Sequence, residues 1–274
     1  MINKWLEHNE QVSSYTFKSI YVSEKAKPDN GTIEYLQAQI ITSYRNLDYY
    51  KFQLENSSEA DIRNFVLNQV IPANVTQFDK NVRQGDWGEI LSALIVAYFQ
   101  NLEVPINKLQ WKLNKDKAVF GTDLFAYNKG DKITDIYYYE IKTRLNPKNK
   151  EGKVPNRNYI TVIAHNSLAK DESAPTESIA EFLSRLFFEM GELNEAKKFK
   201  DMVKNPQNYK RNFEMFFIID KDNFDIKILN ELNILPPQLT PLKVTLIFIE
   251  DLQNLVQNTW NDIESALVKL LKDE

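Results

Sequence analysis

Two apolar runs decide the fold of this chain: Val119-Phe-Gly-Thr-Asp123-Leu-Phe-Ala-Tyr127 and Ile136-Tyr-Tyr-Tyr-Glu140-Ile-Lys142. Both are rich in the β-branched and aromatic residues that favour strands. The residues between them, Asn128-Lys-Gly-Asp131, have the composition of a hairpin turn. We therefore predict an antiparallel pair of strands, from Val119 to Tyr127 and from Thr134 to Thr143.

The charged residues of these runs fall together on the predicted pair. Side chains alternate along a strand, so Glu140 and Lys142 share one face and Ile141 points the other way. Asp123 is the one acid of the first run, and it can lie across from the Glu140 end. A buried carboxylate is costly unless it is paired or bound to a metal ion, so this placement requires an explanation.

Helical and strand-like patterns continue on both sides of the hairpin. Before it, apolar residues at helical spacing predict a helix from Asp86 to Gln100, and a short strand follows from Lys108 to Leu113. After it we predict a basic loop, a mostly helical region, two buried strands and an amphipathic helix: 144–158, 165–203, 213–220, 244–250 and 252–271. This order is typical of an α/β fold in which helices flank a mixed central sheet.

Residues 1–80 carry weaker patterns. Strands are predicted from Thr16 to Val22 and from Tyr35 to Ser43, and a helix from Ser58 to Val70. This N-terminal region adds no residue to the candidate site, so by exclusion it is a candidate partner-binding region. Residues 81–274 would then form the functional domain, although single domains of this total length also exist.

Composition limits the chemistry that the chain can perform. Of 274 residues, none is cysteine and two are histidine, which excludes thiolate sites and makes a histidine-rich zinc site improbable. A metal site would have to be built from carboxylates, which favours Mg²⁺ or Mn²⁺. Neither a phosphate-binding loop nor a dinucleotide motif occurs, so we expect no nucleotide cofactor. Without a signal peptide or a membrane-length apolar run, we expect a cytoplasmic protein.

Asp123, Glu140 and the Ile141 carbonyl could supply oxygen ligands to one cation. Such a cation would neutralise charge during phosphodiester cleavage and lower the pKa of an attacking water. Lys142 could orient that water or stabilise the transition-state phosphate. The alternative is a purely structural role: an ordinary ion pair between Glu140 and Lys142 at a strand end, with Asp123 capping a turn.

The spacing Glu-x-Lys is by itself weak. Glu195-Ala-Lys197 and Asp225-Ile-Lys227 have the same spacing of acid and lysine, but the first lies in a polar helical stretch and the second precedes a predicted helix. Only the run around Glu140 follows an apolar strand with a lone acid. Its context therefore separates it from its two rivals.

Glu89, on the predicted helix before the hairpin, has two readings. It could complete the ligands of the metal ion. Equally, Asp86-Trp-Gly-Glu89 has the spacing of a capping box, with Asp86 as N-cap. His8 and His165 are assigned no catalytic role.

The net charge of −4 does not by itself indicate a nucleic-acid-binding protein, but the basic residues cluster. The predicted loop after Lys142 carries five candidate DNA-binding residues: Arg144, Lys148, Lys150, Lys153 and Arg157. Because phosphate binding depends on the local field, this cluster could bind a DNA backbone beside the site. A second cluster, from Lys197 to Arg211, is more simply a solvated helix face.

These residues resemble a known superfamily. Gly88-Glu89, then Gly121-Thr-Asp123, then Glu140-Ile-Lys142 are similar to the motifs of PD-(D/E)xK nucleases, with Thr122-Asp123 where the motif has Pro-Asp. The order from Gly85 to Lys142, followed by Ser167-Leu-Ala-Lys170-Asp171, resembles the HamA family of Hachiman anti-phage defence systems.

The resemblance implies a restriction-endonuclease-like core with an N-terminal extension, and a Mg²⁺-dependent DNA nuclease. It also implies a separate helicase partner, HamB-like, which supplies the ATPase and restrains the nuclease until infection or DNA damage. Two alternatives stay open. One is a restriction-type endonuclease that recognises a short site, and the other is a non-catalytic nuclease-fold subunit that binds DNA or a partner.

Overall fold

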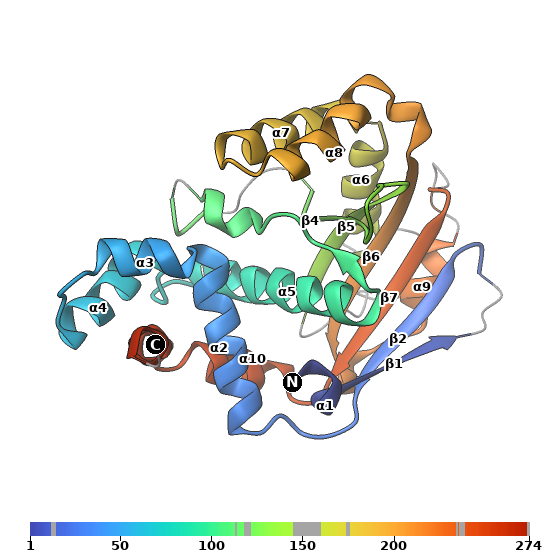
Figure 1. Cartoon of the computed structure of the whole chain (residues 1–274). Coiled ribbons are helices and arrows are strands. Elements are labelled where there is room, and N and C mark those ends of the chain that lie inside the picture. The colour runs from blue at the N-terminus through green and yellow to red at the C-terminus, as the bar shows by residue number, and fades with distance from the viewer. Residues whose placement is uncertain are drawn as a thin grey trace.

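The computed structural model describes residues 1–11, 15–112, 114–117, 122–144, 160–173, 176–233, 235 and 239–272. Within these residues the strands form one seven-stranded sheet in the order β1-β2-β7-β6-β5-β4-β3 (Figure 1). The strand bounds are Leu6–Gln11, Lys18–Glu24, Leu102–Glu103, Leu124–Asn128, Asp135–Arg144, Lys210–Asp220 and Leu242–Ile249, for β1 to β7.

The sheet is mixed. Its centre, β2-β7-β6-β5, is parallel, whereas β1 at one edge and β4 and β3 at the other are antiparallel to their neighbours. Consecutive parallel strands are joined by helices, as parallel connections require. The α/β class and the mixed sheet predicted from the sequence are confirmed.

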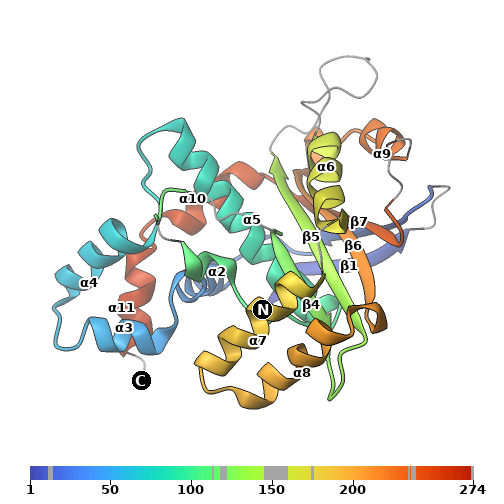
Figure 2. The same cartoon turned by 90° about the horizontal axis from the view of Figure 1, so that it is seen from above.

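Helices cover both faces of the sheet (Figures 1 and 2). Along β5, Tyr139 and Ile141 pack into the core under one helical layer, while Ile136 and Tyr138 pack under the other. This alternation follows from the two-residue period of a strand. The first layer comprises α1 (Ile2–Trp5), α2 (Asn30–Tyr44), α5 (Gln77–Phe99) and α10 (Leu252–Trp260). The second comprises α6 (Ile160–Ser173), α7 (Thr176–Glu189), α8 (Leu193–Lys204) and α9 (Lys227–Leu232).

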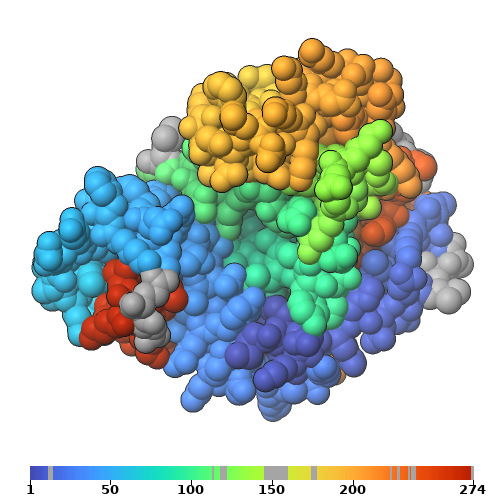
Figure 3. All heavy atoms as spheres, in the orientation of Figure 1, coloured from blue at the N-terminus to red at the C-terminus, as the bar shows by residue number. Residues whose placement is uncertain are grey.

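The remaining helices extend the first layer. Helix α11 (Glu264–Lys272) packs against α4 (Glu59–Phe65), and the two lie side by side with α3 (Leu47–Gln53) at the left of Figure 3. A π-helical turn, Val66–Val70, continues α4, so the helix predicted from Ser58 to Val70 is confirmed. Within the described ranges, no helix combines the length and the apolar character needed to cross a membrane.

Two predicted strands are wrong. Tyr35 to Ser43 lies inside α2, whose first turn is fixed because the Asp29 carboxylate accepts a hydrogen bond from Thr32 N. The apolar residues of this run are buried at helical rather than alternating spacing. The strand predicted from Lys108 begins instead with a 3₁₀ helix, Lys108–Trp111, because the Asn107 side chain accepts from Leu109 N and closes a turn.

Helix α5 begins nine residues earlier than predicted. Thr76 is its N-cap and forms a capping box with Asp79. Asp86 therefore lies in the interior of the helix, and the capping-box reading of Asp86 and Glu89 is wrong. Asp86 is instead buried in an ion pair with Lys112 at 2.5 Å, and it accepts a hydrogen bond from Tyr44.

The hairpin, the helical region from His165 and the two later strands are confirmed, with β4 antiparallel to β5. The last segment is two helices rather than one, because Asp262 adopts φ 51° between α10 and α11. The predicted boundary near residue 80 stays a prediction. Strands β1 and β2 from the N-terminal region nevertheless belong to the same sheet as β7.

Candidate functional site

The candidate site forms where β4 begins. The first pair of the β4–β5 ladder joins Leu124 to Tyr139, so β5 continues beyond that pair without β4 beside it. The Ile141 amide on this edge donates to Asp123 Oδ2 at 2.9 Å, in place of a strand partner. This hydrogen bond fixes Asp123 across from the end of β5 that carries Glu140.

Lys142 links the two carboxylates. Its ammonium donates to Glu140 Oε1 and lies 3.7 Å from Asp123 Oδ2. The Glu140 side chain is only 4% exposed. Burial, reinforced by the charge of Asp123, raises its pKa, and the ammonium of Lys142 opposes that rise. The predicted trio is therefore assembled, with a buried acid at its centre.

Glu89 reaches this group because α5 approaches β5 closely. A Cβ on Gly88 would overlap the Thr143 hydroxyl and lie 3.3 Å from Ile218 Cδ1, so only glycine allows this approach. Burial raises the pKa of Glu89 to about 8, mainly by removing water from the carboxylate. Its Oε2 atom is buried and has no hydrogen-bond partner among the described residues.

Sequence reasoning missed a second lysine in the site. Lys108 Nζ lies 2.9 Å from Asp123 Oδ1 and 3.4 Å from Glu89 Oε1, and its side chain is 14% exposed. Acids and lysines thus alternate from Glu89 to Glu140. Nothing in the sequence around Lys108 indicated this role, since the residue lies in an ordinary polar stretch.

Helix α6 closes the site from the other side of the sheet. Ser167 donates a hydrogen bond to Glu140, and Asp171 accepts one from Thr122, the residue before Asp123. Burial raises the pKa of Asp171, while the Thr122 hydrogen bond opposes that rise. Ser167 and Asp171 stand in the run that carried the family resemblance, and that run was the signal that could have identified them.

The carboxylate oxygens of the site suit a hard divalent cation, provided that the Lys108 ammonium moves away from them. As the side chains are placed in the described part of the chain, no three acidic or histidine groups form a metal-binding cluster. Lys108 lies between Glu89 and Asp123, so its ammonium would have to move aside. The unpartnered Glu89 Oε2 is a free ligand atom, and with the carboxylates of Asp123 and Glu140 it fits such an ion.

The predicted basic surface is only partly described. Arg144, at the end of β5, is exposed, and its guanidinium donates to Thr143 O at 3.2 Å. Lys148, Lys150, Lys153 and Arg157 lie outside the described residues. In the second cluster, Arg211 stacks on Tyr138 and donates to Asp171 O at 2.6 Å, so its role is structural.

The two histidines and the first of the two rival motifs, Glu195-Ala-Lys197, lie in ordinary positions. His8, in β1, stacks on Phe99, and His165 is buried in α6. Glu195 and Lys197 lie in α8, where Glu195 pairs with Lys198. The expected helix face is confirmed there.

Comparison with known families decides the relationship. The HamA family model matches residues 1–264, which is nearly the whole chain and includes every site residue above. The chain belongs to the HamA family. This assigns it to the Hachiman antiviral defence systems. No curated protein matches the chain.

The N-terminal region is part of the family match. The HamA match begins at residue 1 and so includes β1, β2 and α2 together with the candidate site. The family resemblance noted in the sequence is therefore confirmed over a longer span than the motifs that suggested it.

Proposed function

We propose that this HamA-family chain is a metal-dependent DNA nuclease that acts as an effector in antiviral defence. The observation that carries the proposal is the assembly of Asp123, Glu140 and Lys142 at the edge of β5, with Glu89 brought in by the close approach of α5. Acid, acid and lysine at a strand end beside a helical glutamate are the arrangement expected of a PD-(D/E)xK core.

Mg²⁺ or Mn²⁺ would be held by the carboxylates of Glu89, Asp123 and Glu140 and by the Ile141 carbonyl. When bound, the ion would supply charge neutralisation at the scissile phosphate and a lower pKa for the attacking water. Carboxylate and carbonyl oxygens are the ligands that such hard cations prefer. Burial raises the pKa of Glu89 although the Lys108 ammonium lies beside it, so a divalent cation would further stabilise the charged carboxylate.

The protein's own contribution is positional. Glu140 and Asp123 hold the Lys142 ammonium from two sides. From this position Lys142 can donate a hydrogen bond to the attacking water or to a phosphate oxygen as negative charge develops there. Ser167 and the Ile141 amide fix the two carboxylates, so that the site needs little reorganisation during the reaction.

We further propose that a helicase partner delivers DNA to the site and restrains cleavage until infection. No phosphate-binding loop occurs in the sequence, so the energy for strand separation would come from that partner. The alternating lysines support a restrained ground state, because they neutralise the carboxylates that a metal ion would need.

The double variant Glu140→Ala/Lys142→Ala tests the nuclease directly. It should lose Mg²⁺-dependent DNA cleavage. The matched control is Glu195→Ala/Lys197→Ala, which removes the same residue types at the same spacing from α8 and should cleave normally. Full cleavage by the Glu140/Lys142 variant would refute the proposal.

A non-catalytic role is the second candidate, and one observation favours it. Lys108 and Lys142 already occupy positions between the carboxylates, and no metal-binding cluster of three is formed in the described residues. A subunit of this kind would bind DNA or its partner without a metal ion. DNA binding without DNA cleavage, both with and without the proposed helicase, would support the non-catalytic role over the nuclease function.

A further inference from the structure

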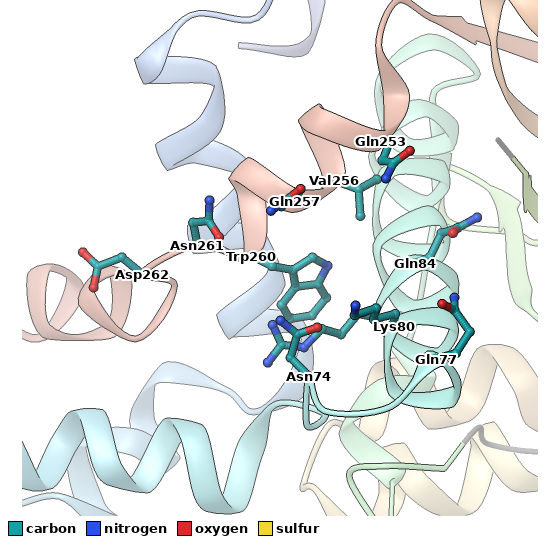
Figure 4. A pocket seen from close by; sticks show the side chains of 11 residues that line it. Asn74, Gln77, Lys80, Gln84, Gln253, Val256, Gln257, Trp260, Asn261 and Asp262 are labelled. Atoms are coloured by element: carbon teal, nitrogen blue, oxygen red, sulfur yellow. The ribbon is translucent and has the colours of Figure 1, made fainter.

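A polar cleft of about 430 Å³ separates α5 from α10. One wall is a row along α5, formed by Gln77, Lys80 and Gln84, and the other is a row along α10 that ends at Trp260 (Figure 4). Residues three or four apart lie on one helix face, so each row forms one wall of the cleft. The full lining is Asn74, Gln77, Lys80, Arg83, Gln84, Gln253, Val256, Gln257, Trp260, Asn261 and Asp262.

The lining is chemically unusual for a surface cleft. Most of its members are asparagine or glutamine, whose side chains each offer donors and an acceptor. Two are cationic, Lys80 and Arg83, against one acid, Asp262, among the described residues that line it. Arg83 is stacked on the indole of Trp260, with its guanidinium carbon 5.0 Å from the ring centroid. The cleft therefore combines paired hydrogen-bonding groups with positive charge.

Trp260 is a second, independent feature of the cleft that points to a ligand. The residue is only 6% exposed, yet its indole Nε1 has no hydrogen-bond partner among the described residues. Figure 4 shows this nitrogen on the side of the ring that faces the two helix rows. Leaving a buried donor unpaired is costly, so an acceptor that reached Nε1 from the cleft would be stabilised there.

The cleft lies beside the candidate catalytic site, and one hydrogen bond links its lining to β5. Gln84 Nε2 donates to Thr143 O at 2.7 Å, and Thr143 follows Lys142 in β5. Gln84 and Glu89 are five residues apart on α5, which is roughly 7.5 Å along the helix axis. Gln77, at the far end of the row, is roughly 18 Å from Glu89 by the same rise. A strand of a few nucleotides could span this length.

We propose that the cleft binds single-stranded DNA, as the stretch of the substrate strand that adjoins the cleaved phosphodiester. The inference rests on the proposed nuclease function. Lys80 and Arg83 neutralise backbone phosphates, while the amide side chains pair with base edges. The Arg83 guanidinium, which lies over the Trp260 ring, provides a planar group on which a base stacks. A peptide ligand would not require two cationic side chains beside the proposed phosphodiesterase site.

Binding is measured without cleavage, by fluorescence anisotropy of a short fluorescein-labelled single-stranded DNA of mixed sequence in EDTA. The test variant is Gln77→Ala/Lys80→Ala/Gln257→Ala, in which all three substituted residues are exposed. The matched control is Lys25→Ala/Gln53→Ala/Gln69→Ala, which removes the same residue types from exposed positions outside the cleft. We expect the dissociation constant to rise roughly tenfold in the cleft variant and to stay unchanged in the control.

A crosslink locates the strand directly. The chain contains no cysteine, so Gln257→Cys introduces a single thiol. In exchange with a mixed disulfide on the DNA backbone, the thiolate of the Gln257→Cys variant attacks the DNA-linked sulfur. A protein–DNA disulfide forms, and the small-molecule half of the original disulfide leaves as its thiolate. Gln257→Cys should crosslink readily, and Gln53→Cys, the control, should react only at the background rate.

The outcomes separate this inference from the nuclease itself. Equal affinity of cleft variant and wild type, or equal crosslinking at Gln257→Cys and Gln53→Cys, overturns the cleft proposal. Cleavage that depends on Mg²⁺ and Glu140 would survive that result. Normal DNA binding through the cleft by a chain that never cleaves would instead overturn the nuclease. Displacement of the labelled DNA by an added peptide, with loss of the crosslink at Gln257→Cys, would also count against the inference.

Discussion

Lys108 donates to Asp123 across 2.9 Å, inside the group of carboxylates that we propose to hold a metal ion. Breaking a buried ion pair by removing one partner is costly, because the other charge is left uncompensated. A divalent cation and this ammonium would compete for the same oxygens. Lys108 therefore stabilises the metal-free site and weakens its affinity for the metal ion.

Replacing Lys108 with glutamine should strengthen metal binding. Without this ammonium, no lysine at position 108 competes with the metal ion for the oxygens of Asp123 and Glu89, so we expect Mn²⁺ to bind at least several-fold more tightly in calorimetric titrations. The metal-free variant should melt at a lower temperature than wild type, and Mn²⁺ should recover the difference. Lys18→Gln removes an exposed pair with Glu10 and serves as control. Weaker Mn²⁺ binding by Lys108→Gln would contradict the competition.

The raised pKa of Glu89 predicts a pH dependence of stability. Folding raises this pKa from 4.5 to about 8, so the folded protein binds more protons than the unfolded chain between these values. The contribution of Glu89 to the free energy of unfolding should fall as the pH rises through that window. Glu89→Gln cannot ionise and should lack this contribution. The test is urea unfolding of both proteins in EDTA across the window. A stability difference that is constant with pH would contradict the assignment.

The two glycines of α5 should respond in opposite directions to alanine. Gly88→Ala forces a methyl group into the Thr143 side chain and should lower the free energy of unfolding by about 1–3 kcal/mol. Adding Thr143→Ala should restore part of that loss. A Cβ on Gly85 meets nothing within 4 Å, so Gly85→Ala should raise the free energy of unfolding by about 0.5–1 kcal/mol. Chemical denaturation measures all three, and equal effects at both glycines would refute the close approach of α5 to β5.

The sequence predicted the hairpin, the shared face of Glu140 and Lys142, and the α/β class, because these depend on local patterns. Alternation places two residues two apart on one face whatever surrounds the strand. The close position of Asp123 also followed from the hairpin, although the hydrogen bond from Ile141 N that fixes it depends on where β4 begins.

The sequence could not predict features set by tertiary contacts. Tyr35 to Ser43 has a strand-like composition, but burial against α5 and the Asp29 cap favour a helix there. Asp86 and Glu89 fit a capping box by spacing, yet the helix continues upstream to Thr76. Lys108 enters the site from a distant 3₁₀ turn, and no short-range pattern encodes such a contact.

Glu140 is the buried acid at the centre of the proposed metal-dependent cleavage site. The most informative measurement compares plasmid DNA cleavage by wild type and Glu140→Gln, in EDTA and after readdition of Mg²⁺, with and without the proposed helicase partner. We predict cleavage by wild type only with Mg²⁺, and a rate reduced roughly a hundredfold or more in Glu140→Gln. Equal cleavage by the two proteins, or no Mg²⁺-dependent cleavage by wild type in either setting, would contradict the account.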